Sequence, residues 1–476
     1  MKKILIICAV TFLTAVTSCT KDITSLNNNP KAATAVPSAT LFSNAQRNLA
    51  DFISTPSVNL NIFRLLSQQW TETTYFDESR YDLVGRNIPG GVFTTLYRDV
   101  LKDFEETKSL IKTDINTADV KANQTAIADI MQVYAYSILV NTFGNVPYSE
   151  ALDFNNVQPK YDDAKTITLD LIARLNADIS AMKPSADSYG GADLIYGGDV
   201  ASWVKFANSL KLRLGIEISD DDAAAAKTAI ESASANCFSS AADDAVFRYL
   251  ASPPNTNPIW VNLVQSGRKD YVIANTLADK MNSLSDPRIP LYFTTDANGG
   301  YSGGIYGTSN SYATFSKPSS TVTAPDFETL FLSYSEIEFY KAEAAEKGFD
   351  VGGIAEVHYN NGITASIKYW GGSDADVITY LANPAVNYAT APGTYKEKIG
   401  TQAWIAFFNR GFEAWTEWRR LDYPILNPPP GLTYADIPVR YTYPIPEQQL
   451  NGVNYTAAAT AIGSDKVSTK LFWDKF

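Results

Sequence analysis

Histidine is nearly missing from this chain of 476 residues, because His358 is the only one. A zinc or copper site built from several histidines is therefore excluded. A Ser-His-Asp triad would have to use His358, which falls within a predicted helix, and no Gly-x-Ser-x-Gly turn is present to hold the nucleophile. We expect no metal, no cofactor and no catalytic residue.

Positive charge is also scarce. The chain has 39 Lys and Arg against 51 Asp and Glu, for a formal net charge of -12. No basic cluster follows the extreme N-terminus, so we expect no nucleic-acid partner. Charged residues make up only 19% and hydrophobic residues 45%, which excludes a disordered chain and predicts a globular one.

Two loop motifs that often bind ions are incomplete here. Asp296-Ala297-Asn298-Gly299 begins like a calcium-binding loop, but Gly307 stands where the bidentate glutamate is needed. The glycine-rich run 299–307 lacks the Gly-Lys-Ser/Thr end of a phosphate-binding loop and has no strand before it. Neither motif predicts an ion or phosphate ligand.

The apolar run near the N-terminus is too short to span a membrane. It covers residues 4–16 after two lysines, whereas a membrane helix needs about 20 residues, and this layout is typical of a secretory signal. The run ends at Val16-Thr17-Ser18-Cys19, which looks like a bacterial lipobox. We predict a lipoprotein signal peptide over residues 1–18 and lipidation of Cys19. The alternative is an ordinary signal peptide with a chance cysteine.

Cysteine is rare as well, with three in the chain. Cys8 lies in the predicted signal and Cys19 takes the lipid, so Cys237 remains alone and no internal disulfide is expected. Several acyl chains on Cys19 would form a lasting membrane anchor. The polar, Asn-rich segment 19–36 shows no periodicity and is predicted to be a tether. Residues 37–476 are then expected to form a single domain.

Helical spacing dominates the rest of the chain. Apolar residues recur every fourth position over 167–179, and residues 122–140 are apolar on nearly every face, as in a buried helix. Asp222 ends an acidic run that fits a helix N-cap better than a calcium site. Further helices are predicted over residues 39–52, 60–70, 93–111, 203–218, 222–235, 272–284, 334–347, 353–369 and 395–421. We expect a fold dominated by α-helices.

The arrangement of these helices suggests hairpins. The helices predicted over 334–347 and 353–369 are joined by a short connection and resemble a tetratricopeptide-type hairpin. Segments rich in Pro, Gly and Asn separate the helical blocks, and long irregular segments are often functional. They cover residues 252–257, 296–311, 427–431 and 451–463. We expect tetratricopeptide-like hairpins together with an irregular, loop-rich lobe that binds the ligand.

Aromatic residues in two loop segments are the candidates for a binding site. In residues 70–81, rings alternate with hydroxyls, carboxylates and a guanidinium, and a second group of tyrosines lies on the glycine-rich loop. Flat rings with a few polar groups suit sugars, although peptides can use the same surface. The alternative is that Trp70 and Tyr81 pack the body while the glycine loop is merely mobile. The ligand-binding candidates are Trp70, Tyr75, Phe76, Asp77, Arg80, Tyr81, Tyr301, Tyr306 and Tyr312.

Several motifs, taken in order behind the lipobox, resemble the SusD/RagB family of outer-membrane nutrient-binding lipoproteins, and within it the SusD-like subgroup. The resemblance extends over essentially all of the chain after the signal peptide. It is carried by Phe143-Gly144-Asn145-Val146-Pro147-Tyr148, by Trp203-Val204-Lys205-Phe206-Ala207-Asn208, by Asp286-Pro287-Arg288, by Tyr359-Asn360-Asn361-Gly362, by Phe412-Glu413-Ala414-Trp415-Thr416-Glu417-Trp418-Arg419-Arg420 and by Phe472-Trp473-Asp474.

The resemblance implies a single helical body of four tetratricopeptide-like hairpins that carries a more irregular lobe. It also implies a location in the outer membrane at the cell surface, and a SusC/RagA-like TonB-dependent transporter as partner. The lipoprotein would sit over the mouth of that transporter as a hinged lid. The family fixes no ligand residues by motif, so the aromatic candidates above are our own prediction.

Three hypotheses follow. The first is a non-enzymatic, surface glycan-binding lid of an uptake complex. The second keeps the lid and changes the cargo to peptides. The third is a lipid-anchored glycoside hydrolase, for which the only motivation is the abundance of carboxylates.

Overall fold

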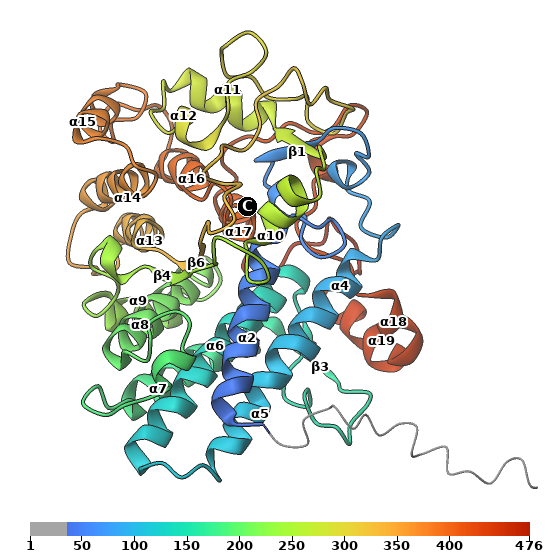
Figure 1. The fold of residues 1–476 in the computed structure, drawn as a ribbon, viewed down its shortest axis with the longest axis vertical. Coiled ribbons are helices and arrows are strands. Elements are labelled where there is room, and N and C mark those ends of the chain that lie inside the picture. Colours follow the sequence, from blue (N-terminus) through green and yellow to red (C-terminus); the bar gives the residue numbers. More distant parts are fainter. Residues whose placement is uncertain (1–35) are drawn as a thin grey trace, which may run out of the picture. The chain divides into compact units, whose positions relative to one another are not determined.

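The computed structural model describes residues 36–476. The predicted signal peptide, Cys19 and the predicted tether up to residue 35 lie outside the described residues. Ser38–Phe476 form one compact unit. Helices make up most of this unit, as expected from the sequence (Figure 1).

The first helices of the unit pack side by side. Helix α2 (Ser38–Ser54) lies along a long helical segment made of α4 (Ile88–Thr94), the π-helix η4 (Thr95–Leu101) and α5 (Lys102–Ile111). Helix α6 (Ala118–Phe143) packs against α5 and is buried along most of its length, as its apolar sequence predicts. The helices predicted over 39–52, 93–111 and 122–140 are thus confirmed.

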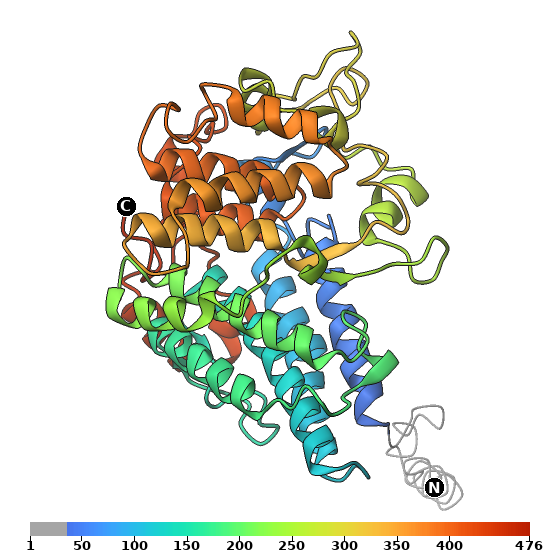
Figure 2. The ribbon, with the colours of Figure 1, turned by 90° about the vertical axis from the view of Figure 1, so that its left-hand side faces the viewer.

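Consecutive helices then pair into hairpins (Figure 2). The pairs are α6 with α7 (Ala164–Ala181), α8 (Val200–Glu217) with α9 (Ala223–Ser234), α13 (Tyr334–Glu346) with α14 (Ala355–Tyr369), and α16 (Tyr395–Ala406) with α17 (Gly411–Leu421). Side-chain caps explain several starts: Asp222 accepts a hydrogen bond from the Ala225 amide, and Ser333 accepts one from the Glu336 amide. Because α8 also packs on α13, the earlier and later hairpins share one core.

Short elements fill the remaining segments. The short helices are α3 (Phe63–Leu66), η3 (Glu78–Arg80), η5 (Gly190–Ala192), η6 (Ala241–Asp243), α10 (Pro258–Trp260), η7 (Val261–Gln265), α11 (Asn275–Ser283), α12 (Ile289–Tyr292), α15 (Asp374–Ala382), η8 (Tyr434–Asp436), α18 (Ile445–Leu450) and α19 (Gly452–Ala461). The strands form antiparallel pairs: β1 (Trp70–Glu72) with β5 (Tyr271–Ile273), β2 (Val146–Pro147) with β3 (Tyr161–Asp162), and β4 (Ala245–Phe247) with β6 (Thr329–Leu332).

The helix predicted over residues 60–70 is largely wrong. Only Phe63–Leu66 are helical, and Trp70 begins strand β1. The helix ends because Gln68 adopts a left-handed backbone conformation, with φ of 53°. Similarly, residues 272 and 273 of the helix predicted over 272–284 belong to β5, and α11 starts only at Asn275.

The helix predicted over residues 395–421 is in fact two helices. The chain turns between α16 and α17, where Asn409 has a φ of 66°. Gly411 then packs so closely on α3 that an added Cβ would lie 2.3 Å from the backbone nitrogen of Arg64. A contact between segments far apart in sequence therefore sets this break, and local spacing does not reveal it.

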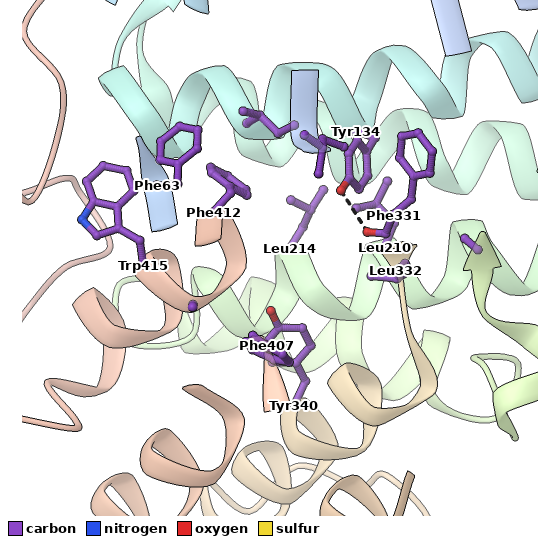
Figure 3. Close-up of a cluster of buried hydrophobic side chains, with 14 of the residues drawn as sticks. Phe63, Tyr134, Leu210, Leu214, Phe331, Leu332, Tyr340, Phe407, Phe412 and Trp415 are labelled. Carbon is purple, nitrogen blue, oxygen red and sulfur yellow. Dashed lines mark hydrogen bonds between the residues drawn. The ribbon is translucent and has the colours of Figure 1, made fainter. Parts of the chain in front are cut away.

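The shared core lies where the earlier and later helices meet (Figure 3). Phe63 stacks on Trp415 at 5.5 Å between ring centroids and meets Phe412 edge-on at 5.3 Å. The buried hydroxyl of Tyr134 donates a hydrogen bond to the carbonyl of Phe331 at 2.9 Å. Because each large apolar side chain contributes about 1.5–3 kcal/mol when fully buried, this cluster holds the two sets of hairpins together.

Charged side chains also lie in this core, where they contact carboxylates, backbone carbonyls or aromatic rings. Arg410 contacts Glu336 at 2.5 Å and Glu413 at 3.3 Å, and Arg213 contacts Glu336 at 3.4 Å. The guanidinium of Arg419 lies 3.5 Å from the centroid of the Trp415 ring. A buried charge is tolerated only when it is paired, so these contacts fix the register of the helices that carry them.

Candidate functional site

The β1–β5 ladder brings the two predicted aromatic segments together. Trp70 of β1 pairs with Ile273 of β5, and Ala274, which follows β5, forms a bridge with Gly304 of the glycine-rich loop. Asn310 of the same loop donates hydrogen bonds from its backbone to the Thr73 carbonyl at 2.8 Å and from its side chain to the Glu72 carbonyl at 3.0 Å. Strand β1 thus forms one lobe beside α11 together with strand β5 and the glycine-rich loop, which follow it about two hundred residues later in the sequence (Figure 1).

The glycine-rich loop is closely packed. A Cβ on Gly303 would lie 2.4 Å from the backbone carbon of Ala274, and one on Gly307 would lie 2.5 Å from Pro429. Gly307 also has a φ of 70°, which favours glycine. The glycines therefore serve the close approach of backbone segments.

Trp70 and Tyr306 are not ligand-contacting residues in this structure, which corrects the prediction for both. Each is only 1% exposed. Trp70 lies in β1 and packs on Tyr271 and on the Arg64 guanidinium, 5.3 Å from its ring centroid. The Tyr306 hydroxyl donates a hydrogen bond to the Leu65 carbonyl at 2.7 Å. Both rings hold the lobe on the helical body.

Arg80 and Tyr81 also have structural contacts. Arg80 donates a hydrogen bond to the Pro430 carbonyl at 2.9 Å and so ties two loops together. Tyr81 is partly buried, lies 6.2 Å from the Tyr306 ring, and accepts a hydrogen bond from the Gln68 side chain at 3.4 Å. Burial raises the pKa of the Tyr81 hydroxyl well above its ordinary value. These two side chains form the wall of the lobe.

The other candidates reach the surface. Tyr75 is 72% exposed, Asp77 is exposed, and Phe76 is partly exposed. Tyr301 and Tyr312 are also partly exposed on the glycine-rich loop. Two ammonium groups lie near the Tyr312 ring, those of Lys269 at 5.8 Å and Lys317 at 5.3 Å from the ring centroid.

A groove of about 410 Å³ opens beside Tyr75. Its size falls within the range of small-ligand sites. The polar groups of its wall come from three separate parts of the chain, and the sequence analysis did not identify most of them. The lining comprises Pro56, Ser57, Val58, Asn59, Glu72, Thr73, Thr74, Tyr75, Arg86, Asn262, Leu263, Arg268, Asp270 and Tyr271. We call this cavity the Tyr75 groove.

A buried carboxyl pair lies at the wall of the Tyr75 groove. One oxygen of Glu72 accepts hydrogen bonds from the amide and hydroxyl of Ser79 at 2.9 and 2.8 Å. Glu78 forms an ion pair with Arg86, while within the described residues its Oε2 atom has no hydrogen-bond partner. Burial, followed by the neighbouring Glu78 carboxylate, raises the pKa of Glu72 well above its ordinary value.

The Tyr75 groove is equipped for binding. It offers an exposed aromatic ring, the amides of Asn59 and Asn262, and the Arg268–Asp270 pair at 3.6 Å. The single histidine lies elsewhere, on α14, where its Nδ1 is 2.9 Å from a carboxylate oxygen of Glu338. Within residues 36–476, no cluster of three or more potential ligands could hold a metal ion.

No helix among the described residues combines the length and apolar character needed to cross a membrane. The described part of the chain is a helical scaffold, and its loop-rich lobe carries an open groove lined by aromatic and polar side chains.

Comparison with known protein families assigns the chain to one of them. Residues 29–444 match the SusD-like family described as "Starch-binding associating with outer membrane". The chain therefore belongs to the SusD-like family.

Solved structures share the same fold. A chitin-binding protein is similar with a TM-score of 0.81 and 26% identity, over 92% of this chain and all 100% of that one. A chitin-binding SusD homologue from Flavobacterium johnsoniae has a TM-score of 0.77 and 25% identity, over 92% and 98%. A SusD homologue from Bacteroides uniformis has a TM-score of 0.77 and 26% identity, over 92% and 99%. None of the curated proteins matches this sequence.

Proposed function

We propose that this chain binds glycans through the Tyr75 groove and acts as the lid of a SusC-like TonB-dependent transporter at the cell surface. The main support is the exposed Tyr75 ring beside a groove of about 410 Å³, in a member of a family described as starch-binding. Two structures with the same fold are named as chitin-binding.

The groove chemistry suits a sugar. The Tyr75 ring can pack against the C–H face of a pyranose, while Asn59, Asn262 and the Arg268–Asp270 pair can exchange hydrogen bonds with its hydroxyls. In the proposed complex, the ligand contacts lid and transporter together, so its affinity is higher for the closed state and it shifts the lid toward closure. The lipid on Cys19 keeps the chain at the outer membrane throughout.

Tyr75→Ala tests the site. We expect it to weaken binding of chitohexaose or maltoheptaose about two- to tenfold in calorimetric titration, because an aromatic contact contributes about 0.5–1.5 kcal/mol. Tyr434→Ala is the matched control, since Tyr434 is also an exposed tyrosine but lines a different groove. Unchanged affinity in Tyr75→Ala contradicts the assignment of this groove. Binding of a peptide pool in place of both sugars identifies peptide cargo.

The partner and the anchor are tested on native membranes. We expect detergent-solubilised membranes to yield this chain together with a large TonB-dependent barrel, and mass spectrometry to find acyl groups on Cys19. Isolation without a barrel contradicts the lid role, and an unmodified N-terminus contradicts the anchor. Recovery of bound oligosaccharide uncut after long incubation distinguishes the binding protein from a hydrolase.

A further inference from the structure

An exposed aromatic side chain lies on the loop between β2 and β3. Phe154 is 88% exposed. Phenylalanine is among the residues most often buried, because its large apolar surface is poorly solvated. A phenylalanine that is exposed next to grooves in the protein surface indicates a binding site for another molecule.

The loop that carries Phe154 is held in place by its own contacts. The Lys102 ammonium donates a hydrogen bond to the Leu152 carbonyl at 3.2 Å. Glu150 accepts hydrogen bonds from the Lys160 amide at 3.1 Å and from the Asn156 side chain at 3.2 Å. The exposed ring is therefore presented by a loop that is already shaped.

Grooves of about 560 Å³ and 400 Å³ lie on the two sides of this loop. They share Lys102 and residues 151–154, so that Phe154 lines both. Each volume suits a small ligand. None of these shared residues lines the Tyr75 groove. In Figure 1, β3 at the base of this loop lies in the lower half of the view, well below β1.

The larger groove has a preorganised polar wall. Arg174 holds Asp129 through two hydrogen bonds of 2.9 and 2.7 Å and donates a third, of 2.9 Å, to the Tyr148 hydroxyl. Lys108 contacts the same aspartate at 2.8 Å. The charges of the lining balance, with three cations and three carboxylates: Lys102, Lys108, Arg174, Glu105, Asp129 and Asp153.

The smaller groove is more apolar. Its wall includes the rings of Phe93 and Tyr97 and is completed by Pro147 and Pro159. The charged side chains that line this groove balance as well, with two cations, Arg98 and Lys102, and two carboxylates, Asp153 and Glu447.

We propose that Phe154 and the two grooves beside it form a second binding site, which takes a neutral oligosaccharide and is separate from the Tyr75 groove. A hydroxyl can donate a hydrogen bond to a carboxylate and accept one from an ammonium or guanidinium group. A neutral polyol can therefore bind both the carboxylates and the cations that line the grooves. A ligand with net charge of either sign meets as much repulsion as attraction there. The sugar C–H faces pack on Phe154 and on the rings of the smaller groove. The ligand class rests on the proposed function, whereas the position of the site rests on Phe154 and the grooves alone.

Binding stoichiometry tests this site. Chitohexaose and maltoheptaose are titrated by calorimetry into the wild type and into Phe154→Ala, Tyr75→Ala and the double variant. For a sugar that binds, we expect two sites per chain in the wild type, with one site weakened about two- to tenfold in each single variant and both sites weakened in the double variant. Val157→Ala is the control, because Val157 is 86% exposed on the same loop but lines neither groove. Since Phe154 is exposed, its removal should not change the melting temperature.

A second readout locates the site directly. In Tyr75→Ala, hydrogen exchange of the amides of residues 148–160 should slow at least twofold when the bound sugar is added, and adding Phe154→Ala should reduce this protection at the same sugar concentration. If Tyr75→Ala weakens sugar binding while Phe154→Ala changes neither affinity nor protection, the second site is refuted and the proposed function stands. If Phe154→Ala weakens binding while Tyr75→Ala does not, the second site stands and the Tyr75 groove does not. Binding of neither sugar refutes both, and protection by a peptide pool instead of the sugars overturns the ligand class.

Discussion

The buried carboxyl pair beside the Tyr75 groove should make folding sensitive to pH. Glu72 and Glu78 are both almost fully buried, and Glu78 is already paired with Arg86. Burial and the Glu78 carboxylate raise the pKa of Glu72 from its ordinary value of 4.5 to about 9. A proton on Glu72 also supplies a donor for the Oε2 atom of Glu78, which has no other partner within the described residues. The folded chain therefore retains this proton when the unfolded chain has lost it.

The sign and size of the effect follow from proton linkage. Above pH 4.5 the unfolded chain ionises Glu72 while the folded chain keeps it protonated, so the unfolded state binds fewer protons. The free energy of unfolding then falls as the pH rises, by about 1.4 kcal/mol per pH unit for one proton. Between pH 5.5 and 7.5, the free energy of unfolding therefore falls by about 2.7 kcal/mol. This contribution is fully present only below pH 4.5.

Glu72→Gln should remove this contribution. Its amide can donate to Glu78, and its carbonyl can still accept from Ser79. In urea denaturation at pH 5.5, 6.5 and 7.5, the stability of the variant relative to the wild type should rise by about 2.7 kcal/mol across the series. Glu150→Gln is the control, because a hydrogen bond from the Lys160 amide lowers the pKa of this exposed carboxylate and places its titration below the window. Parallel stability curves for wild type and Glu72→Gln would refute a proton on Glu72.

Two further predictions concern the scaffold. Trp70→Ala should lower the free energy of unfolding by about 3–5 kcal/mol in urea denaturation, because it empties a buried site; a loss below about 1 kcal/mol contradicts the structural role of Trp70. Gly411→Ala should cost about 1–3 kcal/mol, since the new methyl group meets the Arg64 backbone. Gly452→Ala is its control, because a Cβ there meets no atom within 4 Å, and equal stability of the two variants contradicts the close contact.

Helices whose signals are local could be predicted from the sequence. The apolar spacing of residues 167–179 and the uniformly apolar segment 122–140 correspond to α7 and α6. The predicted cap at Asp222 is confirmed by its hydrogen bond from Ala225. Spacing and caps depend on neighbours in the sequence, so they are readable before the fold is known.

The breaks in the helices could not be predicted in this way. The prediction for 395–421 missed the turn before Gly411 because the cause lies on α3, more than three hundred residues earlier in the chain. The end of α3 depends on Gln68, a residue type that gives no warning of a left-handed conformation.

For the candidate site, composition singled out two segments that the structure brings together, but it could not distinguish their exposed rings from their buried ones. Aromatic richness drew attention to both Trp70 and Tyr75, yet one ring is buried in β1 and the other is exposed. Which ring faces outward depends on the pairing of β1 with β5, and that pairing is not visible in either segment alone. Asn59, Asn262 and Arg268 line the groove without any motif of their own.

The Tyr75 groove is supported by a side chain that no ligand can reach. Arg64 is buried, donates hydrogen bonds to the carbonyls of Ser54 and Thr55 at 2.9 and 3.1 Å and to the Asn409 side chain at 2.7 Å, and lies against the Trp70 ring. It thus connects the end of α2, the turn before α17 and strand β1 at one point. These bonds hold strand β1, whose residue Glu72 lines the groove, on the helical body before any ligand binds. Tyr75 and Arg268, which are exposed and make few contacts with the body, can then change without cost to the fold. In the proposed site, these outer side chains would then set the choice of ligand, and the scaffold beneath them would set only where the ligand lies.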